Sequence, residues 1–213
     1  SLIILGKIPG KWLSSRHTLL GLPVETDLLD LMNLCQEIFR KHLSWAEKLQ
    51  DIFVREGSVD ELCKASVDYF QNPLFVHDSQ MTVISCPIWR SKMIPWEQDE
   101  RTGCMIMPRE ELNELKTDRE YLETLTTRNA QIFSAELRGY RDIYVNIWNT
   151  YGGYEGRLVI CEIDSDLKKG QFAAAEYLAE LIRLTLARRG KMDNTYSRAL
   201  ERMIIAMLQG KEV

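Results

Sequence analysis

The feature of this sequence that most constrains its fold is a stretch from residue 26 to residue 56 that contains neither Gly nor Pro. Apolar residues recur in it with helical spacing and Thr26 or Asp27 can cap its start, so we predict one long helix that ends before Gly57. Written in sevens, its two core positions hold Leu28, Cys35, His42 and Leu49, and Leu31, Ile38, Trp45 and Ile52. This seam leaves two interpretations open: the helix packs on its own domain, or it is a connector that pairs in parallel with the same helix of a second subunit.

Residues 1–25 precede the helix as two short apolar runs separated by Gly and Pro. The pattern predicts a strand, a loop and a strand, with no helix to cover them. Because such a pair cannot bury itself, we expect residues 1–25 to be the remnant of an upstream domain, or strands that dock on something else. Pairing within one subunit and pairing across two are both open.

The region 57–190 alternates short helices with strands, which predicts one domain. Ser58 and Glu61 form a capping box that opens a helix, and Asn72-Pro73 ends it. Strands are predicted at 74–77, 81–85, 131–135, 142–148 and 157–163.

A helical cap is predicted between the second and third of these strands. It consists of an aromatic-rich loop over 86–107 and two short helices, the second opened by a capping box of Thr117 and Glu120. After the last strand, an apolar stripe predicts a second long helix that continues past Gly190 as a linker helix over 191–213. The predicted class is α+β, with an antiparallel sheet of five or six strands, the cap, and long flanking N- and C-terminal helices.

Charge and composition exclude several functions. The chain has 27 Lys and Arg against 31 Asp and Glu, and a net charge of −4 is too weak to indicate a nucleic-acid or membrane partner. No apolar run approaches the ~20 residues of a membrane span. The 5 Cys include no C-x-x-C pair, so we expect a cytoplasmic protein with reduced thiols.

The sequence also lacks motifs for catalysis or metal binding. His17, His42 and His77 are far apart and have no Cys at ligand spacing, so we predict no metal site, and no signature indicates a cofactor. His77-Asp78 invites a catalytic interpretation, but adjacent strand residues point to opposite sides and cannot act as base and orienting group. We therefore predict no enzymatic activity.

The predicted strand 142–148 offers the best candidate for a ligand pocket. Its even-numbered residues share one face and join apolar bodies to polar groups, the mixture that orients a small ligand. With residues of the first and third strands and of the loop, the predicted pocket contains Phe75, His77, Trp89, Trp96, Phe133, Tyr144, Asn146 and Trp148. An ordinary aromatic core is the alternative interpretation of the same residues.

The order of two antiparallel strands, a helical cap and three more antiparallel strands resembles the plan of the PAS and GAF sensor folds. Val59 to Ser85, VDELCKASVDYFQNPLFVHDSQMTVIS, resembles the opening of the GAF-like sensor region in bacterial transcription regulators of the purine-catabolism (PucR) and sugar-diacid (CdaR) type. Glu25 to Phe39, ETDLLDLMNLCQEIF, is similar to their connector helix. Tyr196 to Gly210, YSRALERMIIAMLQG, is similar to the link to their downstream part.

This resemblance implies a GAF/PAS-like sensor domain over 57–190 that binds a small metabolite, forms a homodimer and signals to a C-terminal helix-turn-helix. We expect that DNA-binding region to lie beyond this sequence, so that DNA is contacted only through it and the membrane not at all. Two other interpretations compete: a ligand-free dimerisation or scaffold module of a regulator and, third, a small cytoplasmic enzyme.

Overall fold

The computed structural model describes residues 2–10 and 19–208, with side chains described for residues 3–10 and 19–190. The chain divides into two compact units, Ser1–Ser44 and Trp45–Val213. None of the helices in the described part combines the length and the apolar character that crossing a membrane requires.

The first unit contains a pair of parallel strands and the beginning of the long helix. Strand β1 (Leu2–Leu5) pairs with β2 (Leu19–Leu22) within the chain. Helix α1 (Leu28–Val54) follows, and Asp27 caps it by accepting a hydrogen bond of 2.9 Å from the Asp30 backbone N–H. Parallel strands are normally covered on both faces, and Leu20 is 52% exposed. That this pair docks on another part of the protein stays a prediction, and residues 1 and 11–18 lie outside the described residues.

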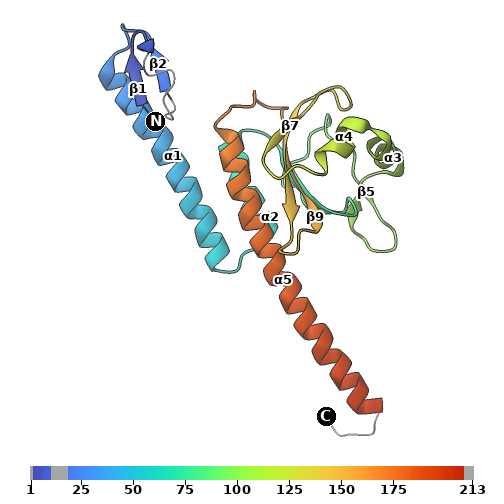
Figure 1. The fold of residues 1–213 in the computed structure, drawn as a ribbon. Coiled ribbons are helices and arrows are strands. Elements are labelled where there is room, and N and C mark those ends of the chain that lie inside the picture. The colour runs from blue at the N-terminus through green and yellow to red at the C-terminus, as the bar shows by residue number, and fades with distance from the viewer. Residues whose placement is uncertain (1, 11–18, 209–213) are drawn as a thin grey trace. The chain divides into compact units, whose positions relative to one another are not determined.

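A five-stranded antiparallel sheet forms the centre of the second unit (Figure 1). The strand order is β4-β3-β9-β8-β7. In chain order the strands are β3 (Leu74–Asp78), β4 (Val83–Ser85), β7 (Gln131–Phe133), β8 (Asp142–Trp148) and β9 (Tyr154–Cys161). Every neighbouring pair is antiparallel, which confirms the predicted α+β class with a sheet of five strands.

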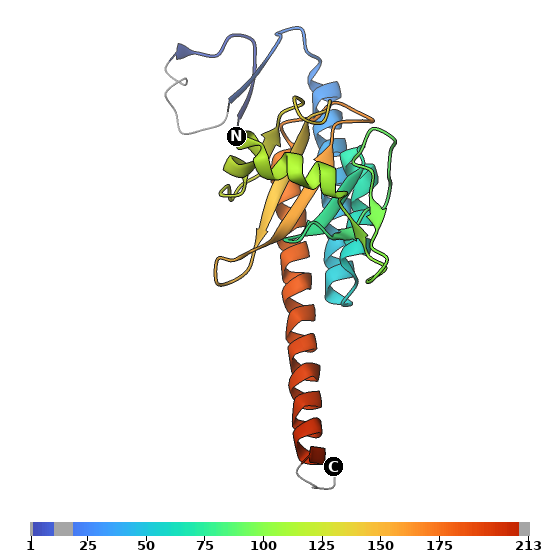
Figure 2. The same ribbon diagram turned by 90° about the vertical axis from the view of Figure 1, so that its right-hand side faces the viewer.

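Helices cover both faces of this sheet (Figure 2). On one face lie α2 (Val59–Phe70) and α5 (Gln171–Leu208). On the other face is the cap, which consists of the short strands β5 (Glu97–Gln98) and β6 (Met105–Ile106) and the helices α3 (Arg109–Thr117) and α4 (Arg119–Thr124). The predicted loop over 86–107 thus contains a short hairpin.

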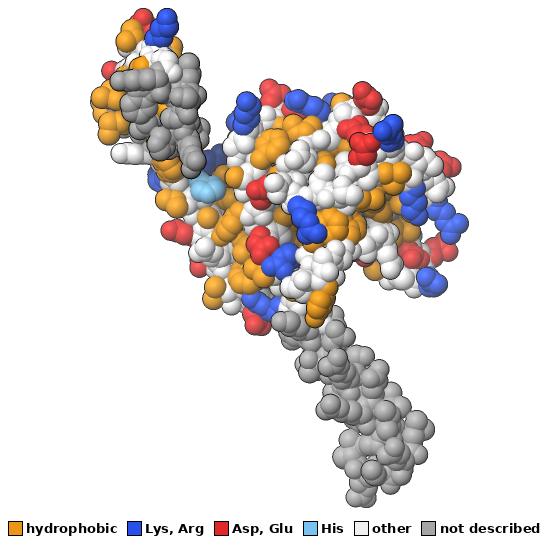
Figure 3. Space-filling view, viewed as in Figure 1, with side chains coloured by type: hydrophobic (Ala, Val, Ile, Leu, Met, Phe, Trp, Pro, Cys, Tyr) orange, Lys and Arg blue, Asp and Glu red, His pale blue; other side chains and the backbone are white. Residues whose placement is uncertain are grey.

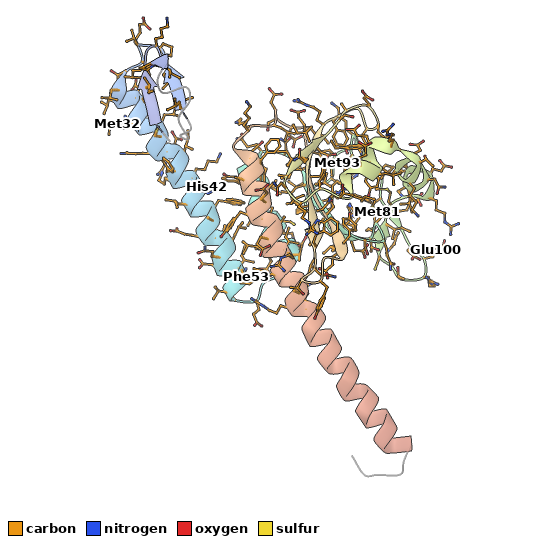
Figure 4. The ribbon with its side chains drawn as sticks, viewed as in Figure 1. Met32, His42, Phe53, Met81, Met93 and Glu100 are labelled. Carbon is orange, nitrogen blue, oxygen red and sulfur yellow. The ribbon has the colours of Figure 1, made fainter. Side chains whose placement is uncertain are left out.

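Side-chain alternation along the strands creates two separate apolar clusters. The helix-face cluster packs against α2 and α5 and includes Val145 and Leu158. The cap-face cluster lies between the sheet and the cap and includes Tyr144 as well as Met81 and Met93, which Figure 4 labels. Neighbouring residues of one strand therefore belong to different clusters, because successive side chains of a strand point to opposite faces.

The last part of α1 belongs to the helix-face cluster. The Trp45 ring stacks on Tyr69 at a centroid distance of 4.0 Å, and its Nε1 donates a hydrogen bond of 3.2 Å to the Ser66 hydroxyl. The helix ends where Glu56 adopts a left-handed φ of 62°. A Cβ on Gly57 would lie 2.6 Å from the Ile52 side chain, so no larger residue fits there.

The structure confirms one of the two predicted capping boxes and contradicts the other. The capping box of Ser58 and Glu61 at the start of α2 is confirmed. The predicted box of Thr117 and Glu120 is wrong, because Asp118 caps α4 instead. Glu120 reaches away from its helix to the residues after β7, where it accepts hydrogen bonds from Ser134.

The second long helix has no break at Gly190, since α5 runs without interruption from Gln171 to Leu208. The predicted linker helix over 191–213 is therefore the continuation of α5 as far as residue 208, and residues 209–213 lie outside the described part.

Asn72 joins two distant turns of the second unit. Its Oδ1 accepts hydrogen bonds from the backbone N–H groups of Ile163, Asp164 and Ser165, at 3.1, 2.9 and 3.0 Å. Its Nδ2 donates to the Ser165 carbonyl at 2.8 Å. This Asn72 clamp ties the turn between α2 and β3 to the loop that leads from β9 to α5.

A substitution at Leu49 tests whether the last part of α1 is packed in the core, because this side chain is fully buried in the helix-face cluster. We expect Leu49→Ala to lower the free energy of unfolding by about 2–5 kcal/mol through the cavity it leaves, as measured by urea unfolding. The control Leu122→Ala, at a position that is 46% exposed, should lower it by less than about 1 kcal/mol. Equal losses in the two variants would contradict the placement of this part of α1 in the core.

Candidate functional site

Most of the predicted pocket residues share the cap face of the sheet. Phe75, His77, Phe133, Tyr144 and Asn146 are all buried there, and none of them is more than 4% exposed. Trp148 is half-buried at the end of β8. This common face follows from the alternation of strand side chains, which the sequence pattern already contains.

The two loop tryptophans lie at the periphery of the cap-face cluster. Trp96 packs edge-on against Phe75, with ring centroids 5.0 Å apart. Trp89 is 49% exposed, and its Nε1 donates a hydrogen bond of 3.0 Å to the Ile94 carbonyl. Both rings line an open hollow of about 490 Å³, together with Val83, Cys86, Pro95 and Met105. The predicted set therefore divides into a filled, buried part and an open part at the loop.

A buried arginine outside the predicted set lies at the centre of the polar part of this face. Arg157 is 3% exposed and stands opposite His77 on β3 and Asn146 on β8 in the sheet register. Its Nε donates a hydrogen bond of 2.8 Å to the Asn146 amide oxygen, and its Nη2 donates one of 2.6 Å to the Thr124 hydroxyl.

Two tyrosine rings complete the surroundings of Arg157. Its Cζ lies 4.5 Å from the ring centroid of Tyr144 and 4.9 Å from that of Tyr121, both within cation–π range. The predicted strand began at Arg157, whereas β9 begins at Tyr154 and makes Arg157 an interior residue. The sequence signal for a buried Arg157 is its place directly before the apolar run at 158–161.

A buried ion pair lies at the start of β8. The Arg138 Nη1 is 3.1 Å from the Asp142 Oδ2, and the Asp142 side chain is 1% exposed. Burial raises the pKa of Asp142 to about 6, although the positive charges of Arg138 and Arg157 act in the opposite direction.

Burial also decides the charge of His77. It lowers the pKa of the imidazole to about 4, so that His77 is neutral at pH 7. The His77 Nδ1 lies 2.7 Å from the backbone carbonyl oxygen of Asp78, whereas the Asp78 carboxylate accepts hydrogen bonds from the backbone N–H groups of Gln80 and Thr82. The pair therefore lacks the geometry of a base and an orienting carboxylate. Among the residues with described side chains, no cluster of three or more His, Cys, Asp and Glu could hold a metal ion.

A second cavity, of about 270 Å³, lies under the cap helices beside the surroundings of Arg157. Its walls are formed by Ser79, Gln80, Met81, Leu112, Lys116, Tyr121, Leu122, Leu125 and Tyr154. None of the predicted pocket residues lines it. Its walls come from α3, α4, the turn between β3 and β4, and the first residue of β9, and the approach of these segments depends on tertiary packing rather than on a local pattern.

The predicted dimer-interface residues of α1 divide into two sets. Trp45, Leu49 and Ile52 are buried in the helix-face cluster of their own domain, as in the first interpretation of the seam. Leu28 and Ile38 are 60% and 58% exposed, and Leu31, Cys35 and His42 are half-buried. Further exposed apolar side chains on this part of α1 are Leu29, Met32, Leu34, Phe39 and Leu43. Figure 3 shows hydrophobic side chains at the surface along α1, and Figure 4 labels Met32.

Comparisons with known proteins assign no family to the chain. No protein-family model matches it, and neither does any curated protein. Among solved structures, the chain is similar to the cofactor binding GAF domain of the nutrient sensor CodY from Clostridium difficile. The identity is 17% and the TM-score 0.49, over 70% of this chain and 97% of that chain.

Two further solved structures are similar at a lower level. The GAF domain of a protein described as a sensor histidine kinase from Pseudomonas syringae pv. tomato is 10% identical, with a TM-score of 0.46 over 81% of this chain and 99% of that chain. The E. coli DhaR(N)-DhaL complex contains a chain that is 12% identical, with a TM-score of 0.38 over 74% of this chain and 57% of that chain. At such identities and TM-scores, none of the three structures informs on the ligand or activity of this chain.

Asp142 and His77 make opposite contributions to the pH dependence of stability. The folded pKa of Asp142, about 6, lies above its ordinary 3.8, so the folded state binds more protons between these values and the free energy of unfolding falls as the pH rises. The folded pKa of His77, about 4, lies below its ordinary 6.5, so the free energy of unfolding rises as the pH rises. Each contribution is about 3 kcal/mol, and the two nearly cancel between about pH 4 and 6.

Single substitutions should reveal each contribution. Relative to the wild type, we expect the free energy of unfolding to rise more steeply from pH 4 to 6 in Asp142→Asn, and to fall over the same range in His77→Gln. Urea unfolding at a series of pH values measures both slopes. Asp68→Asn, on the exposed side of α2, is the control and should follow the wild type. Changes of slope with the same sign in the two buried variants would contradict the assignment.

Proposed function

We propose that this chain is the ligand-sensing and dimerisation part of a transcriptional regulator of the PucR type. In this proposal, a small molecule bound under the cap changes the packing of the sheet, and α5 and α1 carry the change to a C-terminal helix-turn-helix outside this sequence. At its simplest, the proposal is that the domain is a regulatory module rather than an enzyme.

The proposal is carried by one observation: β8 and β9 build both apolar clusters. Tyr144 and Val159 pack under the cap, while Val145 and Leu158, the adjacent residues of the same strands, pack in the cluster that holds α5. A ligand that favours one packing of the cap face therefore acts on residues one peptide bond away from those that hold α5. Because α5 is a single helix as far as Leu208, a shift at its start is carried along its length.

The apolar surface of α1 supports the dimeric part of the proposal. Leu28 and Ile38 lie on the predicted seam and are exposed, which is unfavourable for an isolated helix of this length. Pairing with the same part of α1 in a second copy would cover them.

A ligand-free scaffold module is the second candidate, and the filling of the cap-face cluster favours it. Phe75 and Phe133 are each 1% exposed, and Tyr121 packs edge-on against Phe133 at a centroid distance of 6.4 Å. In this candidate function α1 still pairs, but no small molecule takes part.

Thermal unfolding in the presence of a metabolite library distinguishes the two functions. The sensor function predicts a saturable rise of the unfolding midpoint with at least one compound, because a ligand that binds the folded state stabilises it by mass action. No shift across a broad panel would overturn the sensor function and leave the scaffold.

The dimeric part is tested separately at Ile38. We expect Ile38→Glu to place a charge in the paired seam and to raise the dissociation constant of the dimer at least about tenfold, as measured by sedimentation equilibrium. Gln36→Glu adds the same charge at an exposed position of α1 and should leave the dimer intact. A wild-type chain that is monomeric at high concentration would contradict this part of the proposal.

A further inference from the structure

The open hollow of about 490 Å³ is formed by β4, the loop that follows it and β6, and every residue that lines it is uncharged. Its walls are Val83, Cys86, Trp89, Pro95, Trp96 and Met105. Burial raises the pKa of the Cys86 thiol above its ordinary value, so this side chain is also neutral at pH 7. The volume lies within the roughly 300–1,000 Å³ of small-molecule sites, which are typically lined by apolar and aromatic side chains.

The loop that carries Trp89 is held in place by hydrogen bonds and a salt bridge. The Trp89 Nε1 donates to the Ile94 carbonyl at 3.0 Å, so the one polar atom of this side chain is satisfied within the loop. The Arg90 guanidinium donates hydrogen bonds of 3.2 and 2.9 Å to the two carboxylate oxygens of Asp164, whose backbone N–H belongs to the Asn72 clamp. The Trp89 ring, which is 49% exposed, is therefore a preorganised apolar surface.

The second indole ring connects the hollow to the core of the domain. Trp96 packs edge-on against Phe75 of β3, with ring centroids 5.0 Å apart, and Phe75 is buried in the cap-face cluster. A molecule that contacts Trp96 therefore acts on the cluster that lies between the cap and the sheet. The proposed sensor function requires a ligand to act on this packing.

The hollow suits a small molecule better than a protein partner. Between residues 80 and 110, Trp89 and Met105 are the exposed large apolar side chains, at 49% and 41%. Two side chains supply far less than the ~800 Å² per partner that a stable protein interface buries. Indole rings and a thioether sulfur do form favourable contacts with aromatic rings. A charged molecule, by contrast, would lose its hydration and gain no counter-ion from these walls.

From the neutral lining, the two indole rings and the sulfur atoms, we infer that this hollow binds a neutral molecule with one or two aromatic rings. The ring system contacts the Trp89 and Trp96 rings and the Met105 sulfur, while its polar groups face the open side of the hollow. This inference rests on the proposed sensor function, and it names the site and the chemical class of the ligand.

A matched series of naphthalene derivatives tests the chemical class by isothermal titration calorimetry at neutral pH. The probes are 2-naphthol, its saturated form decahydro-2-naphthol, the cation 2-naphthylmethylammonium and the anion 2-naphthoate. We expect 2-naphthol to bind saturably at one site per chain. The saturated alcohol should bind about tenfold more weakly, because it cannot form ring contacts with the two indoles. Both charged probes should also bind about tenfold more weakly, because the walls offer no opposite charge.

Substitutions test the position of the site. Trp89→Leu removes an exposed ring from the wall and should raise the dissociation constant of 2-naphthol about tenfold. The matched control Tyr151→Leu removes a ring that is 97% exposed between β8 and β9, and it should bind 2-naphthol like the wild type. Met105→Glu places a charge in the hollow at a partly exposed position, and it should abolish binding while the circular dichroism spectrum stays native. It keeps the test decisive if Trp89→Leu rearranges the loop.

The outcomes distinguish the inference from the function on which it rests. If 2-naphthol binds no better than its saturated form, or if a charged probe binds more tightly, the chemical class is overturned. If binding of 2-naphthol survives in both Trp89→Leu and Met105→Glu, the site is overturned. In each of these cases a saturable shift with a compound of the metabolite library still supports the sensor function. If neither the naphthalene series nor the library binds, the inference and the sensor function fall together.

Discussion

The structure depends on the strict alternation of side chains along β8 and β9, two strands that are covered on both faces. On β9, Leu158 and Ile160 face the helices, while Arg157, Val159 and Cys161 face the cap. A register slip of one residue would bring Arg157 into the apolar helix-face cluster, where burial of its charge is unfavourable. The apolar side of these strands thus fixes the register, and the register in turn holds the polar groups of the other side together.

Alternation is also the part of the site that could be predicted from the sequence. β8 has the predicted bounds, and the pocket residues of the strands share the predicted face. The interior position of Arg157 does not follow from the sequence pattern, which predicts a strand that starts at this residue, whereas β9 begins at Tyr154. The role of Asn72 was missed for a different reason: its partners lie more than 90 residues further along the chain, and no local pattern indicates them. For α1, the heptad pattern does not distinguish a helix that packs on its own domain from one that pairs with a partner. In the structure the last part of the helix is buried in its own domain, and the earlier part carries exposed apolar side chains.

The buried polar layer shows how one low-dielectric environment selects different charge states. His77 stays neutral and the protonation of Asp142 is favoured, because burial penalises the charged form of each group. Arginine cannot give up its proton in the same way, so Arg157 keeps its charge and is stabilised by aromatic rings and neutral oxygens. The charge states of these three residues therefore follow from their side-chain chemistry as much as from their position.

The strand order has a consequence for how the chain folds. β9 is the last strand to leave the ribosome, yet it lies between β3 and β8 and joins the two halves of the sheet. Until residue 161 has been synthesised, β3 keeps one unpaired edge, and the hairpin of β3 and β4 has no central strand to support it. Pairing across a separation of roughly 80 residues makes closure of the sheet a non-local and comparatively slow event. A nascent chain of this protein is therefore prone to aggregation, and accessible to chaperones, until β9 has paired with β3 and β8.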